Sequence, residues 1–335
     1  MPPSDCDASR PRVLALLGPT AAGKSRLALE LARVMPVELV SVDSMQVYRG
    51  MDVGTAKPTP EERLRVPHHL LDLVDPGHDF TVAEYQGLAR RAVEEIWGRG
   101  RIPLLVGGSG LYFEAVVFDL RFPPRGDPEI RRELEEELRH DPEAFFRRLA
   151  KVDPLFAIRE DFRNPRRALR AMEVYRVTGR PFTSFVRKRG SYPLLIPYAG
   201  AVINPPRGLL YRLVDQRVDR MMEEGLLEEA RGLLRGGRLS RTARQALGYK
   251  ELFDFLEGRC SLEEAVARIK KATRRYARRQ VIYLRGIPGL RWFSPREEDY
   301  GVGWPDLVRE IGNFLREAWE GEGGAGGSTP GSEGR

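Results

Sequence analysis

Short apolar runs recur along this chain and are separated by longer stretches with helical spacing of apolar residues. The runs 12–17, 37–42, 102–106 and 198–203 are almost continuously apolar, and a shorter one lies at 292–293. Such runs are typical of strands buried on both faces of a parallel sheet. Strands that alternate with helices predict an α/β fold.

Helical spacing fills most of the chain between those runs. Two predicted helices begin with a capping box, in which Thr or Ser is followed by Glu three residues later. These are Thr81 with Glu84 and Ser261 with Glu264. The predicted helices span about 26–35, 82–97, 130–138, 142–152, 165–178, 208–224, 261–285 and 306–319.

The character of the chain changes near residue 120. A proline-rich break at 122–128 leads into a charged, arginine-rich stretch with helical spacing, and an apolar run resumes the core at 198. We therefore expect an all-helical domain inserted into an α/β core. The expected parts are an α/β core from 12–119 and 198–319, an inserted helical domain at 120–197, and disordered ends at 1–11 and 320–335.

A glycine-rich turn links the first predicted strand to the first predicted helix. It reads Gly18-Pro19-Thr20-Ala21-Ala22-Gly23-Lys24-Ser25 and matches G-x-x-x-x-G-K-[ST] in the context that this motif requires. The backbone N–H groups of such a loop bind phosphate, Lys24 reaches the terminal phosphates, and the Ser25 hydroxyl is placed to ligate Mg²⁺. The motif predicts a bound phosphate or diphosphate and a P-loop core of the nucleotide-kinase type. It does not say whose phosphate is bound.

Two further segments follow predicted strands directly. Asp43 comes after the second strand, and Gly107–Gly110 follows the third. Ligands of open α/β sheets bind at the carboxyl ends of the strands, so both segments are expected beside the phosphate loop. Asp43 is either a turn residue or a catalytic or metal-linked carboxylate, and its position favours the second interpretation.

The net positive charge of the chain lies in two blocks. The chain carries +7, whereas residues 159–189 carry +7 and residues 268–285 carry +8, which leaves −8 on the remaining residues. Concentrated basic blocks are typical of a surface that binds a polyanion, although charge runs also occur on solvated helix faces. Two cysteines and four histidines provide neither a disulfide framework nor a zinc spacing, and a reducing cytoplasm is expected. No long uncharged apolar window is present, so no membrane contact is expected.

Most phosphate loops serve hydrolysis or transfer of a nucleotide γ-phosphate, but this sequence departs from that pattern. We find no apolar run ending in Asp-Glu for an ATPase and no Asn-Lys-x-Asp for guanine. A small-metabolite kinase also has little use for a basic helical insertion and a second basic helix. These features indicate a nucleic-acid backbone as partner.

The motifs at 18–25, 41–48, 51–57, 105–112, 245–251 and 273–280 occur in the order seen in the bacterial tRNA dimethylallyltransferase family, and the resemblance covers about residues 12–295. Ser25 and Ser109 stand where the family commonly has Thr, and both keep the hydroxyl.

The resemblance implies transfer of a dimethylallyl group from its diphosphate to N6 of adenosine 37 in tRNA. In that reaction the phosphate loop (residues 18–25) holds the diphosphate, not ATP. Lys24, Arg217 and Mg²⁺ at Ser25 neutralise the leaving group, and Asp43 is the general base. A flipped adenosine is expected, because a base in the anticodon loop must leave its stack to react. The residues implied in tRNA binding are Asp43, Ser44, Met45, Gln46, Ser109, Arg131, Arg166, Arg167, Ala168, Leu169, Arg170, Arg244, Gly248 and Tyr249. The implied partners are tRNA and dimethylallyl diphosphate, and the protein is expected to be a cytoplasmic monomer.

Three alternatives stay open on the sequence. They are a phosphate-loop small-molecule kinase, an adenylate isopentenyltransferase that uses a free nucleotide, and a non-catalytic RNA-binding protein with a vestigial loop. The destination of label from dimethylallyl diphosphate distinguishes them.

Overall fold

The computed structural model describes residues 12–159, 162–187 and 189–321. The chain forms two compact units. The first comprises the residues up to Val117 and those from Leu195 onward, and the second comprises Phe118–Leu194. The helical insertion therefore begins two residues before and ends three residues before the expected 120–197. The expected disordered ends lie outside the described residues, apart from Glu320 and Gly321.

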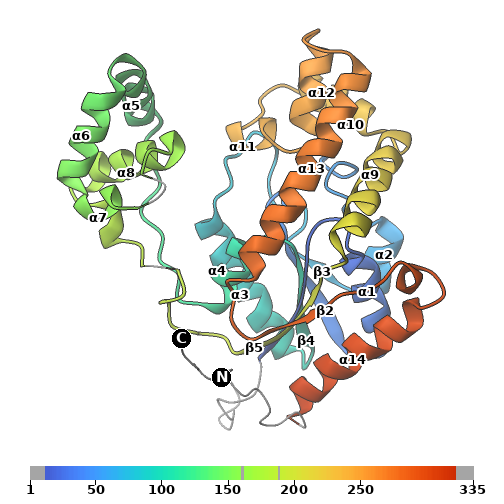
Figure 1. Cartoon of the computed structure of the whole chain (residues 1–335). Helices are drawn as coiled ribbons and strands as arrows, with labels where there is room; N and C mark the ends of the chain where they lie inside the picture. The colour runs from blue at the N-terminus through green and yellow to red at the C-terminus, as the bar shows by residue number, and fades with distance from the viewer. Residues whose placement is uncertain (1–11, 160–161, 188, 322–335) are drawn as a thin grey trace, which may run out of the picture. The chain divides into compact units, whose positions relative to one another are not determined.

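A six-stranded parallel sheet forms the centre of the first unit, in the order β3-β2-β4-β1-β5-β6 (Figure 1). Its strands are β1 (Val13–Leu17), β2 (Val37–Val42), β3 (His68–His69), β4 (Ile102–Gly107), β5 (Tyr198–Ile203) and β6 (Leu290–Phe293). All neighbours pair in parallel, with Leu14 opposite Leu104 and Ala199. The carboxyl ends of the strands therefore share one edge of the sheet, and the α/β prediction is confirmed.

Helices cover both faces of this sheet (Figure 1). The helices of the first unit are α1 (Lys24–Leu31), α2 (Pro60–Arg65), α3 (Val82–Gly98), α4 (Gly110–Val117), α9 (Arg207–Glu223), α10 (Leu226–Arg235), α11 (Arg241–Arg244), α12 (Tyr249–Leu256), α13 (Leu262–Leu284) and α14 (Trp304–Glu320). Leu14 and Leu16 pack with residues of α1 and α14 in one buried cluster. The alternate residues of β1 are also buried but lie outside that cluster, because successive side chains of a strand point to opposite faces.

The capping boxes predicted at Thr81 and Ser261 are both present, at the starts of α3 and α13. Two details of the helix predictions were wrong. Regular α1 ends at Leu31, not Met35, because the N–H groups of Arg33 and Val34 bond three residues back. In α13 the helical spacing of apolar residues in the sequence predicts that Ile282 is buried, but this residue is 56% exposed. The buried stripe instead includes Thr273 and Gln280, polar residues that an apolar pattern does not count.

The second unit is all-helical and consists of α5 (Pro128–His140), α6 (Pro142–Val152), α7 (Pro154–Ala157), α8 (Pro165–Thr178) and a 3₁₀ turn at Phe182–Ser184. Each of the four α-helices starts with Asp or Asn as the N-cap and Pro as the first helical residue. The side-chain oxygen accepts an otherwise unpaired N–H, and proline provides a preset φ where no N–H is needed. Aromatic residues of α6 and α7 and apolar residues of α8 form its core.

No helix in the described ranges is both long enough and apolar enough to cross a membrane.

Candidate active site

The phosphate loop lies between β1 and α1 in an unusual backbone conformation. Gly18 has a φ of +152°, and a Cβ at this position would lie 2.4 Å from the Ile203 carbonyl oxygen on β5. Ala21 and Gly23 also have positive φ, of 67° and 85°. Only glycine adopts this region readily, so the loop holds a conformation that the surrounding structure must stabilise.

Lys24 begins α1 and reaches back across the loop, where its Nζ donates to the Pro19 carbonyl at 2.7 Å. Burial of its ammonium group lowers the pKa of Lys24 to about 7. Nearby Arg217 lowers it further, and Asp43 opposes the change. Burial also lowers the pKa of Arg217, again against the attraction of Asp43. Two partly buried cations held close together at a pocket are suited to bind a multiply charged anion.

Asp43 follows β2 at the same edge of the sheet. Its Oδ1 accepts the Met45 N–H at 2.8 Å, which orients the carboxylate. Asp43 interacts electrostatically with Lys24 and Arg217, and its charge also contributes to raising the pKa of Tyr276, chiefly through burial, to about 12. The structure thus brings a carboxylate into the same site as the two cations.

One open pocket joins these groups. Thr20, Lys24, Ser25, Asp43, Gln46 and Arg217, all expected at the site, line it. The sequence analysis missed other lining residues, among them His68, Tyr276 and Gln280. Gln280 Oε1 accepts the Thr20 N–H at 2.9 Å, across 260 residues of sequence. Tyr276 and Gln280 occur in the 273–280 motif, which was the only signal that could have pointed to them.

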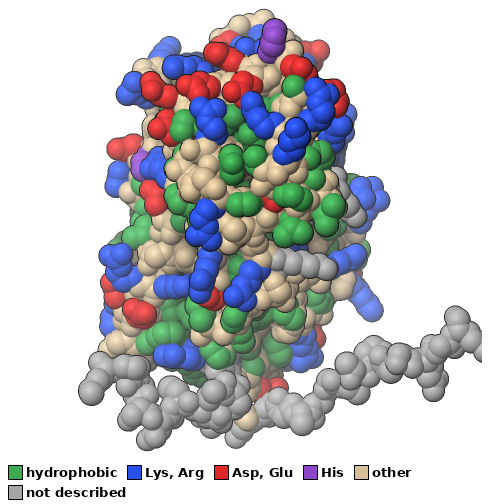
Figure 2. All heavy atoms as spheres, turned by 90° about the vertical axis from the view of Figure 1, so that its left-hand side faces the viewer, with side chains coloured by type: hydrophobic (Ala, Val, Ile, Leu, Met, Phe, Trp, Pro, Cys, Tyr) green, Lys and Arg blue, Asp and Glu red, His purple; other side chains and the backbone are tan. Residues whose placement is uncertain are grey.

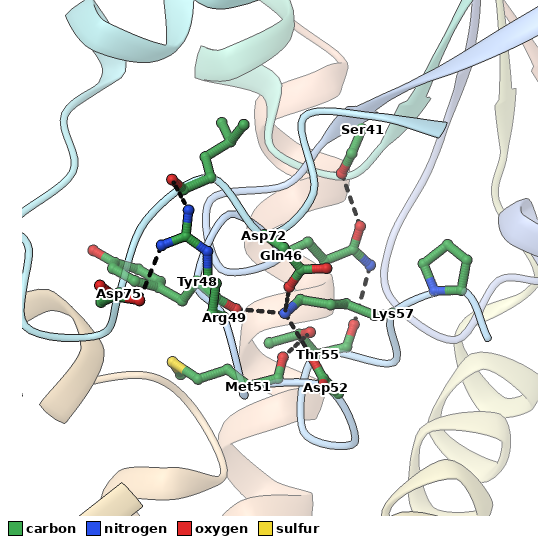
Figure 3. Close-up of polar contacts among 12 residues, drawn as sticks. Ser41, Gln46, Tyr48, Arg49, Met51, Asp52, Thr55, Lys57, Asp72 and Asp75 are labelled. Atoms are coloured by element: carbon green, nitrogen blue, oxygen red, sulfur yellow. Dashed lines mark hydrogen bonds and ion pairs between the residues drawn. The ribbon is translucent and has the colours of Figure 1, made fainter. Parts of the chain in front are cut away.

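The segment after Asp43 is fixed by a polar network (Figure 3). Gln46 Nε2 donates to the carbonyls of Thr55 and Ala56 at 3.2 and 3.4 Å, and its Oε1 accepts the Ser41 hydroxyl at 2.8 Å. Lys57, whose side chain is 1% exposed, pairs with Asp52 and Asp72 at 2.6 Å each. Ser44 and Met45 lie within this fixed segment, between Asp43 and Gln46.

Ser109 and its neighbours lie at the end of β4, as expected from the sequence. The Ser109 N–H donates to the Val42 carbonyl at 3.2 Å, and its side chain interacts with the Tyr276 hydroxyl. Ser109 is therefore connected both to β2, just before Asp43, and to α13.

Gly248 and Tyr249, which were expected to contact RNA, are both buried in the structure. Tyr249 is fully buried, and its hydroxyl donates to Glu229 Oε1 at 2.5 Å. The Glu229 carboxylate also accepts the N–H groups of Asp52, Val53 and Gly54 at 2.7, 2.9 and 3.1 Å. Tyr249 thus supports the 52–54 backbone. Gly248 is buried too, whereas Arg244 is exposed and pairs with Glu257.

In the helical unit the expected RNA-contacting residues differ in their exposure and in their contacts within the protein. Ala168 and Leu169 are buried in the core, because they lie on the inner face of α8, so their side chains cannot contact RNA. Arg170 is occupied by Glu173 at 2.8 Å and the Pro124 carbonyl at 2.6 Å. Arg131, 20% exposed, pairs with Glu135 at 3.0 Å. The exposed members of the run are Arg166 and Arg167.

The basic block on α13 is likewise partly used within the protein. Lys270 pairs with Asp219 and Arg274 with Asp215 on α9, at 2.6 and 2.5 Å. Lys271, Arg275 and Arg278 are exposed. On the face in Figure 2, lysine and arginine side chains are interspersed with acidic and hydrophobic ones.

The parallel sheet, the phosphate loop and the adjoining carboxylate define a P-loop α/β enzyme with an anion site and a candidate base. The family model described as "IPP transferase" matches residues 46–286, and one described as "Isopentenyl transferase" matches residues 11–72. The chain therefore belongs to the IPP transferase family of prenyltransferases, as its motifs indicated.

Individual relatives agree with this placement. A "tRNA dimethylallyltransferase" of Geobacillus thermodenitrificans is 42% identical over 91% of this chain and 98% of its own, and one of Geobacter metallireducens is 47% identical over 84% and 92%. The crystal structure of a tRNA isopentenylpyrophosphate transferase from Bacillus halodurans matches with a TM-score of 0.65 and 39% identity, over 94% of this chain and 99% of that one. A eukaryotic dimethylallyltransferase described as acting on tRNA matches with a TM-score of 0.73 and 26% identity, over 90% and 79%.

Proposed function

We propose that this enzyme transfers a dimethylallyl group from dimethylallyl diphosphate to N6 of adenosine 37 in tRNA and releases diphosphate. The observation that carries the proposal is the placement of Asp43 in one cavity with Lys24 and Arg217, beside the phosphate loop. A kinase needs the cations but has no evident use for the basic surfaces. We further propose that the protein acts in the cytoplasm and as a monomer.

The phosphate loop and the two cations hold the diphosphate. As the bond between C1 of the dimethylallyl group and the bridging oxygen breaks, its electron pair leaves with the diphosphate. Negative charge then builds on the leaving group, and the N–H groups of residues 21–25, Lys24 and Arg217 stabilise it in a site largely removed from water. Bound diphosphate favours the protonated form of Lys24 and so offsets the effect of burial.

Asp43 takes the proton. The N6 amine is a weak nucleophile because its lone pair is conjugated with the purine, so the C–N bond forms as a proton is lost from nitrogen. The Asp43 carboxylate, oriented by the Met45 N–H, accepts that proton. The reaction balances: one C–N bond forms, one C–O bond breaks, and one proton passes from N6 to the carboxylate.

The donor set also fits Mg²⁺. Mg²⁺ prefers oxygen ligands and is usually held by one or two protein groups together with substrate phosphates and water. Ser25, exposed at the loop, supplies a hydroxyl oxygen beside the diphosphate position. Within the described ranges no three acidic, His or Cys residues cluster as a metal site, so the other ligands would have to come from the diphosphate and water. When bound, the ion neutralises diphosphate charge.

The adenine is held by the segment after Asp43. Gln46 lines the cavity with its amide fixed by Ser41 and by the carbonyls of Thr55 and Ala56. A rigid polar group at this point is suited to orient a flipped base. The exposed arginines Arg166 and Arg167, with Arg244 and the exposed cations of α13, bind RNA phosphates.

The test is the destination of the label from labelled dimethylallyl diphosphate. The proposal expects label in tRNA, and none in AMP under the same conditions. Label in AMP would instead identify an adenylate isopentenyltransferase. Phosphate transfer from ATP without any prenyl transfer would identify a kinase, and tRNA binding without turnover would identify a binding protein.

A further inference from the structure

We propose that Tyr300 and Trp304 are positioning residues for the phosphate loop, acting from behind it on the backbone that faces the diphosphate. The inference rests on the proposed diphosphate site and adds a segment outside both family-model matches, neither of which extends beyond residue 286. This segment consists of the 3₁₀ turn Glu298–Tyr300 and the start of α14 (Trp304–Glu320). In Figure 1, α14 and the chain leading into it lie beside α1.

The first contact is a hydrogen bond to the loop backbone. The Tyr300 hydroxyl donates to the Ala22 carbonyl at 3.1 Å, across 278 residues of sequence. In a trans peptide the C=O of one residue and the N–H of the next point in opposite directions. Holding the Ala22 carbonyl toward Tyr300 therefore turns the Gly23 N–H away from Tyr300, to the side on which a phosphate-loop amide meets its anion.

The second contact is packing under Gly23. A Cβ on Gly23 would lie 3.1 Å from Trp304 Cη2 and 3.4 Å from Tyr300 Cε1, so the two rings lie directly against this glycine. Trp304 is 4% exposed. Arg26 completes the arrangement, with its guanidinium carbon 4.1 Å from the centre of the Trp304 ring.

The loop needs such support because of its conformation. Ala21 adopts a positive φ that is unfavourable for a residue with a side chain, and Gly23 adopts another. Strained backbone persists where surrounding contacts determine it. The supporting segment is itself anchored, because Trp304, Leu307 and Ile311 belong to the same buried cluster as Ala22 and Leu27.

The indole of Trp304 contributes through packing and not through a hydrogen bond. Its Nε1 is buried without a hydrogen-bond partner among the described residues. A buried donor without a partner is unfavourable, so replacing Trp304 by Phe removes that penalty together with some packing. Trp304→Phe is therefore expected to fold, and its effect on ligand binding can be measured.

The test is the affinity for inorganic diphosphate with Mg²⁺, measured by calorimetry on the full-length protein. Tyr300→Phe should weaken binding about three- to tenfold, the effect of losing one neutral hydrogen bond that orders the site. KM for dimethylallyl diphosphate should rise in parallel, with tRNA affinity unchanged. Tyr198→Phe is the matched control, because the Tyr198 hydroxyl also donates to a backbone carbonyl, that of Pro288, but at the start of β5, the opposite end of the strands. It should leave diphosphate affinity unchanged.

Tryptophan fluorescence provides a second readout that a purely stabilising role would not move. Diphosphate should change the emission of the wild-type protein, and Trp304→Phe should abolish that change. Wild-type binding with unchanged affinity in Tyr300→Phe, or a signal that survives in Trp304→Phe, would overturn the inference. A wild-type protein that does not bind diphosphate would overturn the proposed diphosphate site itself.

Discussion

Lys24 is predicted to take up a proton when diphosphate binds. Its pKa, 10.5 for a free side chain, falls to about 7 through burial and the proximity of Arg217. This shift corresponds to ~5 kcal/mol in favour of the neutral amine. At pH 8 roughly one Lys24 in ten is then protonated in the protein without ligand, whereas at pH 6 roughly nine in ten are. A bound diphosphate favours the ammonium form, so binding at pH 8 draws a proton from solution.

The sign of the pH dependence follows directly. Diphosphate affinity should decrease as pH rises through about 7, because the proton must be supplied at increasing cost. The stability of the ligand-free protein should respond in the opposite sense. Between pH 7 and 10.5 the unfolded chain holds a proton at Lys24 that the folded chain lacks, so this residue makes folding more favourable as pH rises.

Calorimetry in buffers with different ionisation enthalpies measures the number of protons taken up. The uptake should increase by ~0.8 proton from pH 6 to pH 8, the difference between the two unprotonated fractions of Lys24. Lys24→Arg is the matched control, since a guanidinium stays protonated and contributes no uptake. Equal uptake by the wild type and Lys24→Arg at both pH values would refute the reasoning.

Two further predictions concern RNA. Affinity for tRNA should fall steeply as the salt concentration rises. Neutralising an exposed cation of α13 should reduce the slope of log K against log salt by about 0.7–0.9 per charge, whereas the control Arg309→Gln on α14 should not change the slope. Equal slopes in the α13 variants and the wild type would show that the basic block of α13 does not bind RNA. The α13 variants are Lys271→Gln, Arg275→Gln and Arg278→Gln. Tyr249→Phe should lower the unfolding free energy by about 1.5–3 kcal/mol, because it loses a hydrogen bond to a carboxylate, yet leave RNA affinity unchanged. Weakened RNA binding without a change in the midpoint of urea unfolding would indicate that Tyr249 contacts RNA.

Features that depend on local pattern could be predicted from the sequence. The motif at Gly18–Ser25 between a strand and a helix indicated the loop, and parallel strands placed Asp43 beside it, since their carboxyl ends share an edge. Capping boxes and Asx-Pro helix starts also have a local cause, because the residues that form them lie within a few positions of one another in the sequence.

What could not be predicted depends on contacts between distant segments. The Glu229 carboxylate bonds a backbone more than 170 residues away, and Tyr300 meets the loop across 278 residues. Neither partner has a local signature. Ala168 and Leu169 lie in a basic stretch of sequence, but they are on the inner face of α8 and are buried in the core. The basic composition of the stretch does not show which of its residues face inward.

The most direct measurement of the central claim is mass spectrometry of nuclease fragments from tRNA incubated with enzyme and dimethylallyl diphosphate. The account predicts one added dimethylallyl group, at N6 of adenosine 37, and no product from tRNA with guanosine at that position. With Asp43→Asn the rate should fall about 10²–10⁴-fold while tRNA still binds, as expected for loss of a general base. A product at another position, or a near-wild-type rate in Asp43→Asn, would contradict the account.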